Sequence, residues 1–208
     1  GFDDPVISAS VERLASGLYG LDRMAGGYTN ILTDVEHSAE DSGDALTAML
    51  HIAPNDTIWV DRARQLGQLM GDLWTAENDR GLLQFQSTYF TDTIVSSSEN
   101  YACDTSYHVR AVQPLLLYWQ RSGDPATGDL LSAWLDTWAD VAIRPSDDKP
   151  GGILPSAIQW PSGEASFADR PWWEPGCAAN ASAYNWPRAL SPLLRTLVLA
   201  NVMTSDEH

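Results

Sequence analysis

Basic residues are scarce in this chain. Twelve lysines and arginines stand against 28 aspartates and glutamates, Lys149 is the single lysine, and the formal net charge is −16. Such a charge repels phosphate backbones and anionic membrane surfaces, so neither nucleic acid nor a membrane is an expected partner. No apolar run approaches the roughly 20 residues that span a bilayer, and the first residues do not resemble a signal peptide. We expect a globular protein that is secreted or periplasmic, without its export signal.

Cysteine and histidine are also few. Cys103 and Cys177 both fall in loop-like stretches. They either pair or remain two isolated thiols, because two cysteines make no metal-binding pattern. The zinc-protease pattern HExxH is absent as well. The sequence therefore predicts neither a metal site nor a cofactor.

Helical periodicity, by contrast, is abundant. Apolar residues recur at intervals of three and four in IWVDRARQLGQLMGDLW (58–74) and DLLSAWLDTWADVAI (129–143), which predicts amphipathic helices. Spacing and capping residues predict further helices at about 5–24, 39–53, 105–121 and 185–204. Alternation typical of strands occurs only in the short QFQSTYF and GILPSAIQW. We predict an all-α fold for a single domain over residues 1–208.

A weak internal repeat suggests how these helices are arranged. ALTAMLHIAPND (45–56), LLLYWQRSGDPA (115–126) and LVLANVMTSDEH (197–208) each end an apolar helix in a short polar turn. The first two turns lead into another helix, so the repeating unit is a helical hairpin, with long loops between units. Because the third unit stops at its turn, we expect a segment of a longer helical array. A complete six-helix domain is the alternative.

The stretch YACDTSYHVR places Tyr101, Tyr107, His108 and Arg110 at the start of a predicted helix. A tyrosine beside a cation can shuttle a proton, and a histidine can take one near neutral pH. This pattern favours a catalytic cluster. In the alternative interpretation Tyr107 packs, His108 pairs with Asp104, and Arg110 pairs with an acid at the surface.

A second candidate is His37, in TDVEHSAEDSGD, with Glu36 and Glu40 beside it. His37 precedes its helical hairpin as Tyr107 and His108 precede theirs, so a toroidal array would bring both groups to one central face. Because acids at a helix N-terminus are favoured by the helix dipole, a solvated cap is the alternative.

Two loops, 75–103 and 144–184, are longer than the connections usual in compact domains. The second is rich in tryptophan, proline and glycine. Half-exposed tryptophans stack on sugar rings while polar neighbours bond hydroxyls, which predicts sugar binding; rings that plug the end of the core are the alternative. The candidate substrate-binding residues are Trp160, Trp172, Trp173, Glu174, Asn185, Trp186 and Arg188.

Several of these stretches together resemble the (α/α)-toroid carbohydrate-active proteins, and among them the polysaccharide lyases that act on uronate chains. The stretches are DVEHSAEDSGDAL, QSTYF, YHVRAVQPLLLYWQRSGDP, KPGGILPSAIQWPSGE, PWWEPG and YNWPRAL, spanning roughly residues 30 to 204. The resemblance implies helical hairpins around a central cleft and cleavage of an acidic polysaccharide by β-elimination.

In such lyases a tyrosine or histidine removes the proton from C5 of the uronate, and a tyrosine often protonates the leaving oxygen. The resemblance makes Tyr107 or Tyr101 the base or acid. It makes His108 or His37 the partner of that tyrosine. The candidates for neutralising the carboxylate are Arg110, Arg188 and Asn185, and those for lining sugar subsites are Trp172, Trp173 and Trp186.

Two features depart from this pattern. A complete toroid has about twice as many helices as the sequence predicts, so another chain or a further segment would have to complete the cleft. The acidic surface would repel an anionic glycan unless Arg110, Lys149, Arg170 and Arg188 gather locally.

Two other functions stay open. One is a glycoside hydrolase on the same architecture, with paired carboxylates drawn from Glu36, Glu40 and Glu174. The other is a non-catalytic carbohydrate-binding helical module.

Overall fold

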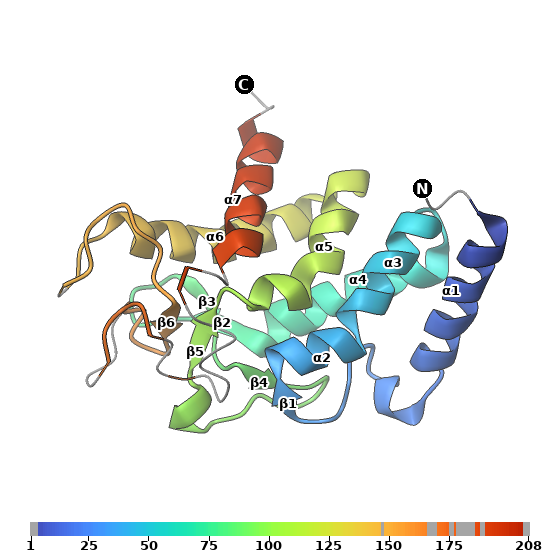
Figure 1. Cartoon of the computed structure of the whole chain (residues 1–208), viewed down its shortest axis with the longest axis horizontal. Helices are drawn as coiled ribbons and strands as arrows, with labels where there is room; N and C mark the ends of the chain where they lie inside the picture. The colour runs from blue at the N-terminus through green and yellow to red at the C-terminus, as the bar shows by residue number, and fades with distance from the viewer. Residues whose placement is uncertain are drawn as a thin grey trace.

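The computed structural model describes residues 4–146, 148–165, 170–174, 177, 186–187 and 190–205. Within these residues, seven α-helices are combined with three two-stranded antiparallel sheets (Figure 1). The prediction of an all-α fold, with helical hairpins that form a toroid or a segment of one, is therefore wrong. The fold is mixed, with helices that carry most of the core and small sheets that tie the loops to them.

The helices nevertheless lie close to where their periodicity predicts them. Their bounds are α1 Pro5–Tyr19, α2 Val35–Asp41, α3 Gly43–Ile52, α4 Thr57–Leu69, α5 His108–Ser122, α6 Pro125–Ile143 and α7 Leu190–Ser205. Short 3-10 turns cover Asp22–Met24 and Glu99–Tyr101, and a π turn over Met70–Trp74 extends α4. Four helices begin at an aspartate whose carboxylate accepts first-turn amides, namely Asp4, Asp34, Asp56 and Asp124.

Two of the predicted helical hairpins are present. The first joins α3 to α4 and the second joins α5 to α6, where Gly123 ends α5 with a φ of 65°. α5 lies at the centre of the helices, because α2, α3, α4, α6 and α7 all contact it, while α1 packs on α3. Pro114 lies inside α5 and leaves the carbonyl of Arg110 without its helical donor. The backbone of Gly43 packs close to that carbonyl, where a Cβ would lie 3.4 Å from the oxygen.

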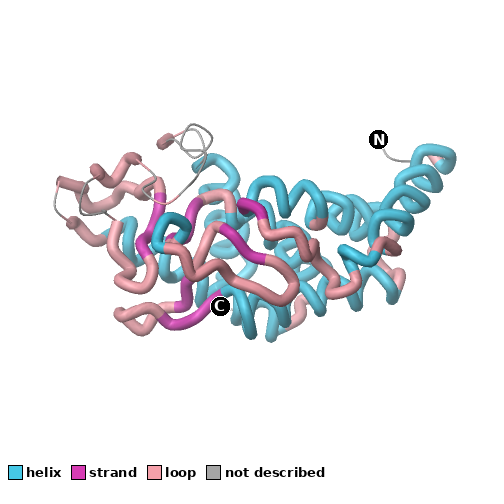
Figure 2. Tube along the Cα trace, turned by 90° about the horizontal axis from the view of Figure 1, so that it is seen from below, coloured by secondary structure: helices cyan, strands magenta, loops and turns pink. Residues whose placement is uncertain are grey.

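The sheets connect segments that are far apart in the sequence. β1 (Thr33–Asp34) pairs with β4 (Tyr89–Phe90), β2 (Thr75–Glu77) with β3 (Leu83–Phe85), and β5 (Cys103–Thr105) with β6 (Ala157–Gln159). β4 and β6 lie in the two stretches that alternate in the sequence, and β3 overlaps the first of them. Each strand has only two or three residues, too few for a period of two to be recognised. Figure 2 shows the strands and loops gathered on one side of the helices.

The hydrophobic core is one continuous cluster of buried side chains that runs from Ala15 in α1 to Ala200 in α7. Its largest members are aromatic, and Trp74 contacts both Phe85 and Phe90. None of the described helices is both long and apolar enough to cross a bilayer.

Cys103 and Cys177 form a disulfide, so the paired alternative is the one found. The bond ties β5 to the tryptophan-rich loop. The hydroxyl of Thr88 also donates to the carbonyl of Cys177, at 3.4 Å. These contacts hold the chain at Cys177 beside the segment that carries Tyr89 and Tyr101.

Candidate functional site

His108 lies inside the core. Its Nδ1 is 2.9 Å from Asp104 Oδ1, and its Nε2 is 3.0 Å from the carbonyl oxygen of Ser87. The ring stacks on Phe85 with 4.2 Å between ring centroids. The other carboxylate oxygen of Asp104 accepts a bond of 2.7 Å from Trp134 Nε1. Because His108 and Asp104 are both 0% exposed, the structure gives this pair a packing role and keeps it out of reach of a polymer.

Arg110 extends from the first turn of α5 to two acids. One guanidinium nitrogen is 3.2 Å from Glu40 on α2, and another is 2.7 Å from Asp44 on α3. The side chain of Arg110 is 35% exposed, and those of both acids are 51% exposed. Arg110 is thus paired with surface acids, as the alternative interpretation has it. Exposed ion pairs contribute at most about 1 kcal/mol, so another carboxylate can replace either acid at low cost.

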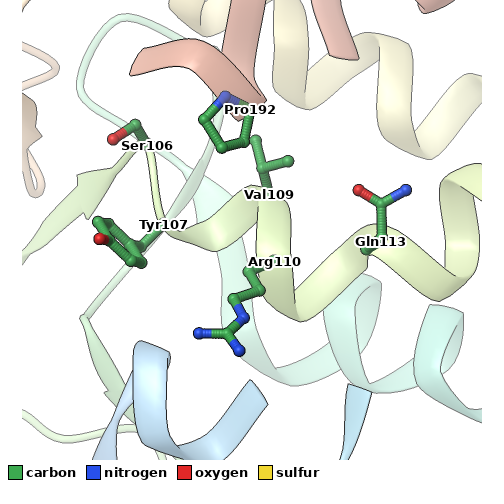
Figure 3. Close-up of a pocket in the computed structure, with 6 residues that line it drawn as sticks. All are labelled: Ser106, Tyr107, Val109, Arg110, Gln113 and Pro192. Carbon is green, nitrogen blue, oxygen red and sulfur yellow. The ribbon is translucent and has the colours of Figure 1, made fainter. Parts of the chain in front are cut away.

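A pocket of about 270 Å³ opens between the start of α5 and the first turn of α7. Its lining residues are Ser106, Tyr107, Val109, Arg110, Gln113 and Pro192 (Figure 3). Tyr107 is half-buried and packs against the core. Ser106 is 1% exposed, and its hydroxyl has no hydrogen-bond partner among the described residues. Figure 3 shows the Arg110 guanidinium pointing away from Pro192.

His37, by contrast, is open to solvent and held in place. Its side chain is 56% exposed, and its Nδ1 is 2.7 Å from Asp34 Oδ2. The other oxygen of Asp34 accepts the backbone amides of Glu36 and His37, at 3.0 and 3.2 Å, and so begins α2. The hydrogen bond to Asp34 raises the pKa of His37, and its carboxylate charge raises it further. Asp34 therefore sets both the orientation and the proton affinity of an accessible imidazole.

Two tyrosines border this pair. Asp34 and Tyr89 are direct partners in the β1–β4 ladder, and residues directly opposite in an antiparallel pair project to the same face. The ring of Tyr89 stacks on that of Tyr101 with 3.8 Å between centroids and 20° between planes. Burial raises the pKa of Tyr89, and the charge of Asp34 adds to this effect. We call Asp34, His37, Tyr89 and Tyr101 the His37 cluster.

The His37 cluster lies in acidic surroundings that Arg110 partly offsets. The charges of Glu40 and Glu36 further raise the pKa of His37. Glu40 follows His37 by about one helical turn and is the residue that Arg110 contacts. Indirect contacts thus link His37 to Tyr101 through Asp34 and Tyr89. Arg110 reaches the same helix through Glu40, while His108 is enclosed in the core.

The described tryptophans of the long loop form a cluster of their own. Trp172 is 8% exposed and meets Trp173 and Trp186 edge to face, each at 5.4 Å between centroids. Trp173 and Trp186 are 42% and 38% exposed. Trp186 donates to the carbonyl of Leu154 at 3.0 Å, which fixes its indole. One ring therefore packs, as the alternative for this loop has it, while two present surface on which a sugar can stack.

The remaining candidates are more scattered. Trp160 follows β6, is half-buried and bonds through its amide to the carbonyl of Ala102, at 3.0 Å. Glu174 is exposed beside Trp173. Asn185 and Arg188 lie outside the described residues.

The expected gathering of positive charge does not include Lys149. Its ammonium group donates to the carbonyls of Ala142, Arg144 and Pro150, at 2.9 to 3.2 Å, and the residue is 1% exposed. Burial lowers the pKa of Lys149. Lys149 therefore satisfies backbone carbonyl groups at and just after the end of α6, and its charge is not exposed at the surface. Among the described residues, no group of three or more His, Cys, Asp or Glu side chains is arranged to hold a metal ion.

Sequence reasoning missed the role of two residues in the His37 cluster. Asp34 is one of several acids in TDVEHSAEDSGD, although an Asp three residues before a His at a helix start is the spacing that lets the cap contact the imidazole. Tyr89 was not singled out. The alternation in QSTYF indicates a strand. It does not show which residue lies opposite Tyr89 until the partner strand is known.

Comparisons with protein-family models, curated proteins and solved structures found no match to this chain.

Proposed function

We propose that this protein is a polysaccharide lyase that cleaves a uronic-acid-containing glycan by β-elimination. The observation that supports this best is the His37 cluster, in which an accessible imidazole is held by Asp34 beside two stacked tyrosines. An imidazole and phenol hydroxyls are the proton-transfer groups that an elimination needs.

The reaction needs one base and one acid. In the proposed step, neutral His37 takes the proton from C5 of the uronate, and the electron pair of that bond forms the C4–C5 double bond. The bond from C4 to the glycosidic oxygen breaks, and the hydroxyl of Tyr101 gives its proton to that oxygen. Burial and the charge of Asp34 keep Tyr89 protonated, so its ring supports Tyr101 without supplying a base.

The carboxylate of the substrate must be neutralised while negative charge develops at C5. Arg110 is the cation that we assign to this task, because it contacts Glu40, three residues after His37 on α2. Its present partners, Glu40 and Asp44, are half-exposed, and a uronate carboxylate would replace one of them. Trp173 and Trp186 would stack on other sugar rings of the same glycan.

A hydrolase is less well supported by the contacts. It needs two carboxyl groups about 5 to 9 Å apart, one on each side of the scissile bond. Glu40 is engaged by Arg110, and Glu174 lies in the tryptophan-rich loop. Glu40 and Asp44 both pair with the guanidinium of Arg110, and no contact among the described residues places Glu174 opposite a second acid.

The test is a panel of alginate, glucuronan, ulvan, pectin and glycosaminoglycans, incubated with the protein while the ultraviolet absorbance of an unsaturated product is followed. We expect one substrate to give a rise. His37→Gln and Tyr101→Phe should each lower kcat by about a hundredfold or more. His51→Gln, which changes an exposed histidine at the end of α3, should leave kcat unchanged.

Three outcomes would contradict the proposal. New reducing ends without an absorbance rise would indicate a hydrolase. Binding without any product would indicate a carbohydrate-binding module. Full activity of His37→Gln, together with loss of activity in Tyr107→Phe, would move the site to the pocket at the start of α5.

A further inference from the structure

A second pocket lies at the opposite end of α5 from the proposed lyase site. It has a volume of about 300 Å³, at the lower end of the range for small-molecule sites. The turn between α3 and α4 forms one wall, and the last turn of α5 forms the other. Its lining residues are Leu50, Pro54, Asn55, Thr57, Val60, Arg64, Tyr118, Arg121 and Ser122.

Two arginines line this pocket, Arg64 and Arg121, although the chain as a whole carries a formal charge of −16. Arg121 has no carboxylate within ion-pair distance among the described residues; its guanidinium instead lies 3.2 Å from His51 Nδ1. Arg64 donates through Nε to the hydroxyl of Tyr118 at 3.2 Å and pairs with Asp61 at 2.8 Å. Hydrogen bonds from Thr127 lower the pKa of Asp124, and the charge of Arg64 lowers it further, so Asp61 and Asp124 both partly compensate Arg64. Of the two arginines that line the pocket, Arg121 therefore has the less balanced charge.

The N-terminus of α4 forms part of the wall but adds no net positive charge, because Asp56 caps it by accepting the amide of Ile58 at 2.8 Å. The C-terminal ends of α3 and α5 explain why His51 and Arg121 are stable here. These helix ends do not explain why a pocket lies beside the two arginines.

We propose that this pocket binds an oxyanion carried on a compact ligand, through the guanidinium groups of Arg121 and Arg64. A guanidinium matches a carboxylate or a phosphate with two parallel hydrogen bonds. Leu50, Pro54 and Val60 line the same space, so the body of the ligand meets apolar surface while its charged group meets the arginines. The oxyanion comes either from a sugar acid or from free phosphate.

This inference does not depend on the proposed lyase activity. Arg110 and Arg121 are eleven residues apart on α5, which corresponds to roughly 16 Å along a helix. None of the residues that line the second pocket belongs to the His37 cluster. The two proposals can therefore fail separately.

The test is a titration followed by the backbone amide NMR shifts of the protein at low ionic strength, where charge interactions are least screened. The probes are galacturonate, inorganic phosphate and, as a neutral control, galactose. We expect saturable shifts at residues 54–60 and 118–122 with at least one anion. Arg121→Gln and Arg64→Gln should each weaken that binding by about tenfold or more. Arg13→Gln removes the same charge from exposed α1, and His37→Gln alters the other site; both should change it less than about twofold.

The outcomes also identify the source of the anion. Saturation with galacturonate alone indicates a sugar acid, and saturation with phosphate alone indicates a phosphate ligand. The proposal is overturned if neither anion saturates these shifts, if galactose produces the same shifts, or if Arg121→Gln binds as well as the wild type.

Discussion

Asp34 uses its two carboxylate oxygens for separate purposes around His37. One oxygen accepts two backbone amides and begins α2, while the other lies 2.7 Å from the imidazole. Asparagine retains an oxygen that can cap the helix but carries no charge. A substitution at this residue can therefore separate the cap from the electrostatic effect.

We predict that Asp34→Asn lowers the pKa of His37 while leaving α2 intact. In the wild type, the hydrogen bond to Asp34 raises this pKa above its usual value of 6.5. The contact therefore contributes stability that is complete below about pH 6.5 and is lost as the pH rises through the higher folded-state value. Titration of the His37 ring by NMR measures the pKa, and circular dichroism checks the helix. Equal His37 pKa values in the two proteins would contradict the prediction.

The same substitution tests the role of His37 in catalysis. If neutral His37 is the base, kcat/KM rises with pH through the pKa of the free enzyme. In Asp34→Asn this rise should move to lower pH, in step with the pKa measured by NMR. A pH profile that does not move would remove His37 from the role of base.

Trp134 and Trp138 allow a matched comparison of one buried hydrogen bond. Both are 0% exposed and lie on α6. Trp134 Nε1 donates to Asp104 at 2.7 Å, whereas Trp138 Nε1 has no hydrogen-bond partner among the described residues. We expect Trp134→Phe to lower the free energy of unfolding by about 1–3 kcal/mol more than Trp138→Phe, because a buried carboxylate loses its best donor. Urea denaturation measures both, and equal losses would mean that this bond contributes nothing.

The contact between α5 and α6 depends on Gly128, which has no Cβ. A Cβ on Gly128 would lie 2.6 Å from Nε1 of Trp119, whereas one on Gly67 in α4 would lie 3.5 Å from Leu115, an ordinary contact. We predict that Gly128→Ala destabilises the protein by about 1–3 kcal/mol, because the indole must move. Gly67→Ala should stabilise it by about 0.5–1 kcal/mol through helix propensity. Melting temperatures should shift in opposite directions, and a rise in both would show that α6 can move away from α5.

The spacing of apolar residues predicted most helices correctly, with two exceptions. The helix expected over 39–53 is divided at Ser42 into α2 and α3, because the carbonyl of Ser42 accepts the hydroxyl of Tyr19 and its own hydroxyl accepts the amide of Thr29. The helix expected over 5–24 ends at Tyr19. Ser42 bonds to partners at least 13 residues away, which no periodicity of apolar residues reveals.

At the scale of the whole molecule, the disulfide joins two residues that are far apart in the sequence. Cys103 and Cys177 are 74 residues apart, and the entropy of closing a loop of this length corresponds to about 4 kcal/mol. We predict that changing both cysteines to alanine lowers the free energy of unfolding by about 2–5 kcal/mol. Urea denaturation measures this loss. Reductant should destabilise the wild type to a similar extent and leave the variant unchanged. Equal midpoints for the oxidised wild type and the variant would contradict the prediction.

The sequence alone determined where most helices lie, because apolar spacing acts within a few residues. It also identified His37, Tyr101 and Arg110 as residues able to carry chemistry. Only the tertiary structure decided how these groups are used. His108 is enclosed by Phe85 and Asp104, Arg110 is held by Glu40, and the Asp34–His37 pair acquires its tyrosines through a ladder between Asp34 and Tyr89. These partners come from separate segments of the chain, and strands of two or three residues gain their stability from such pairing rather than from their own sequence.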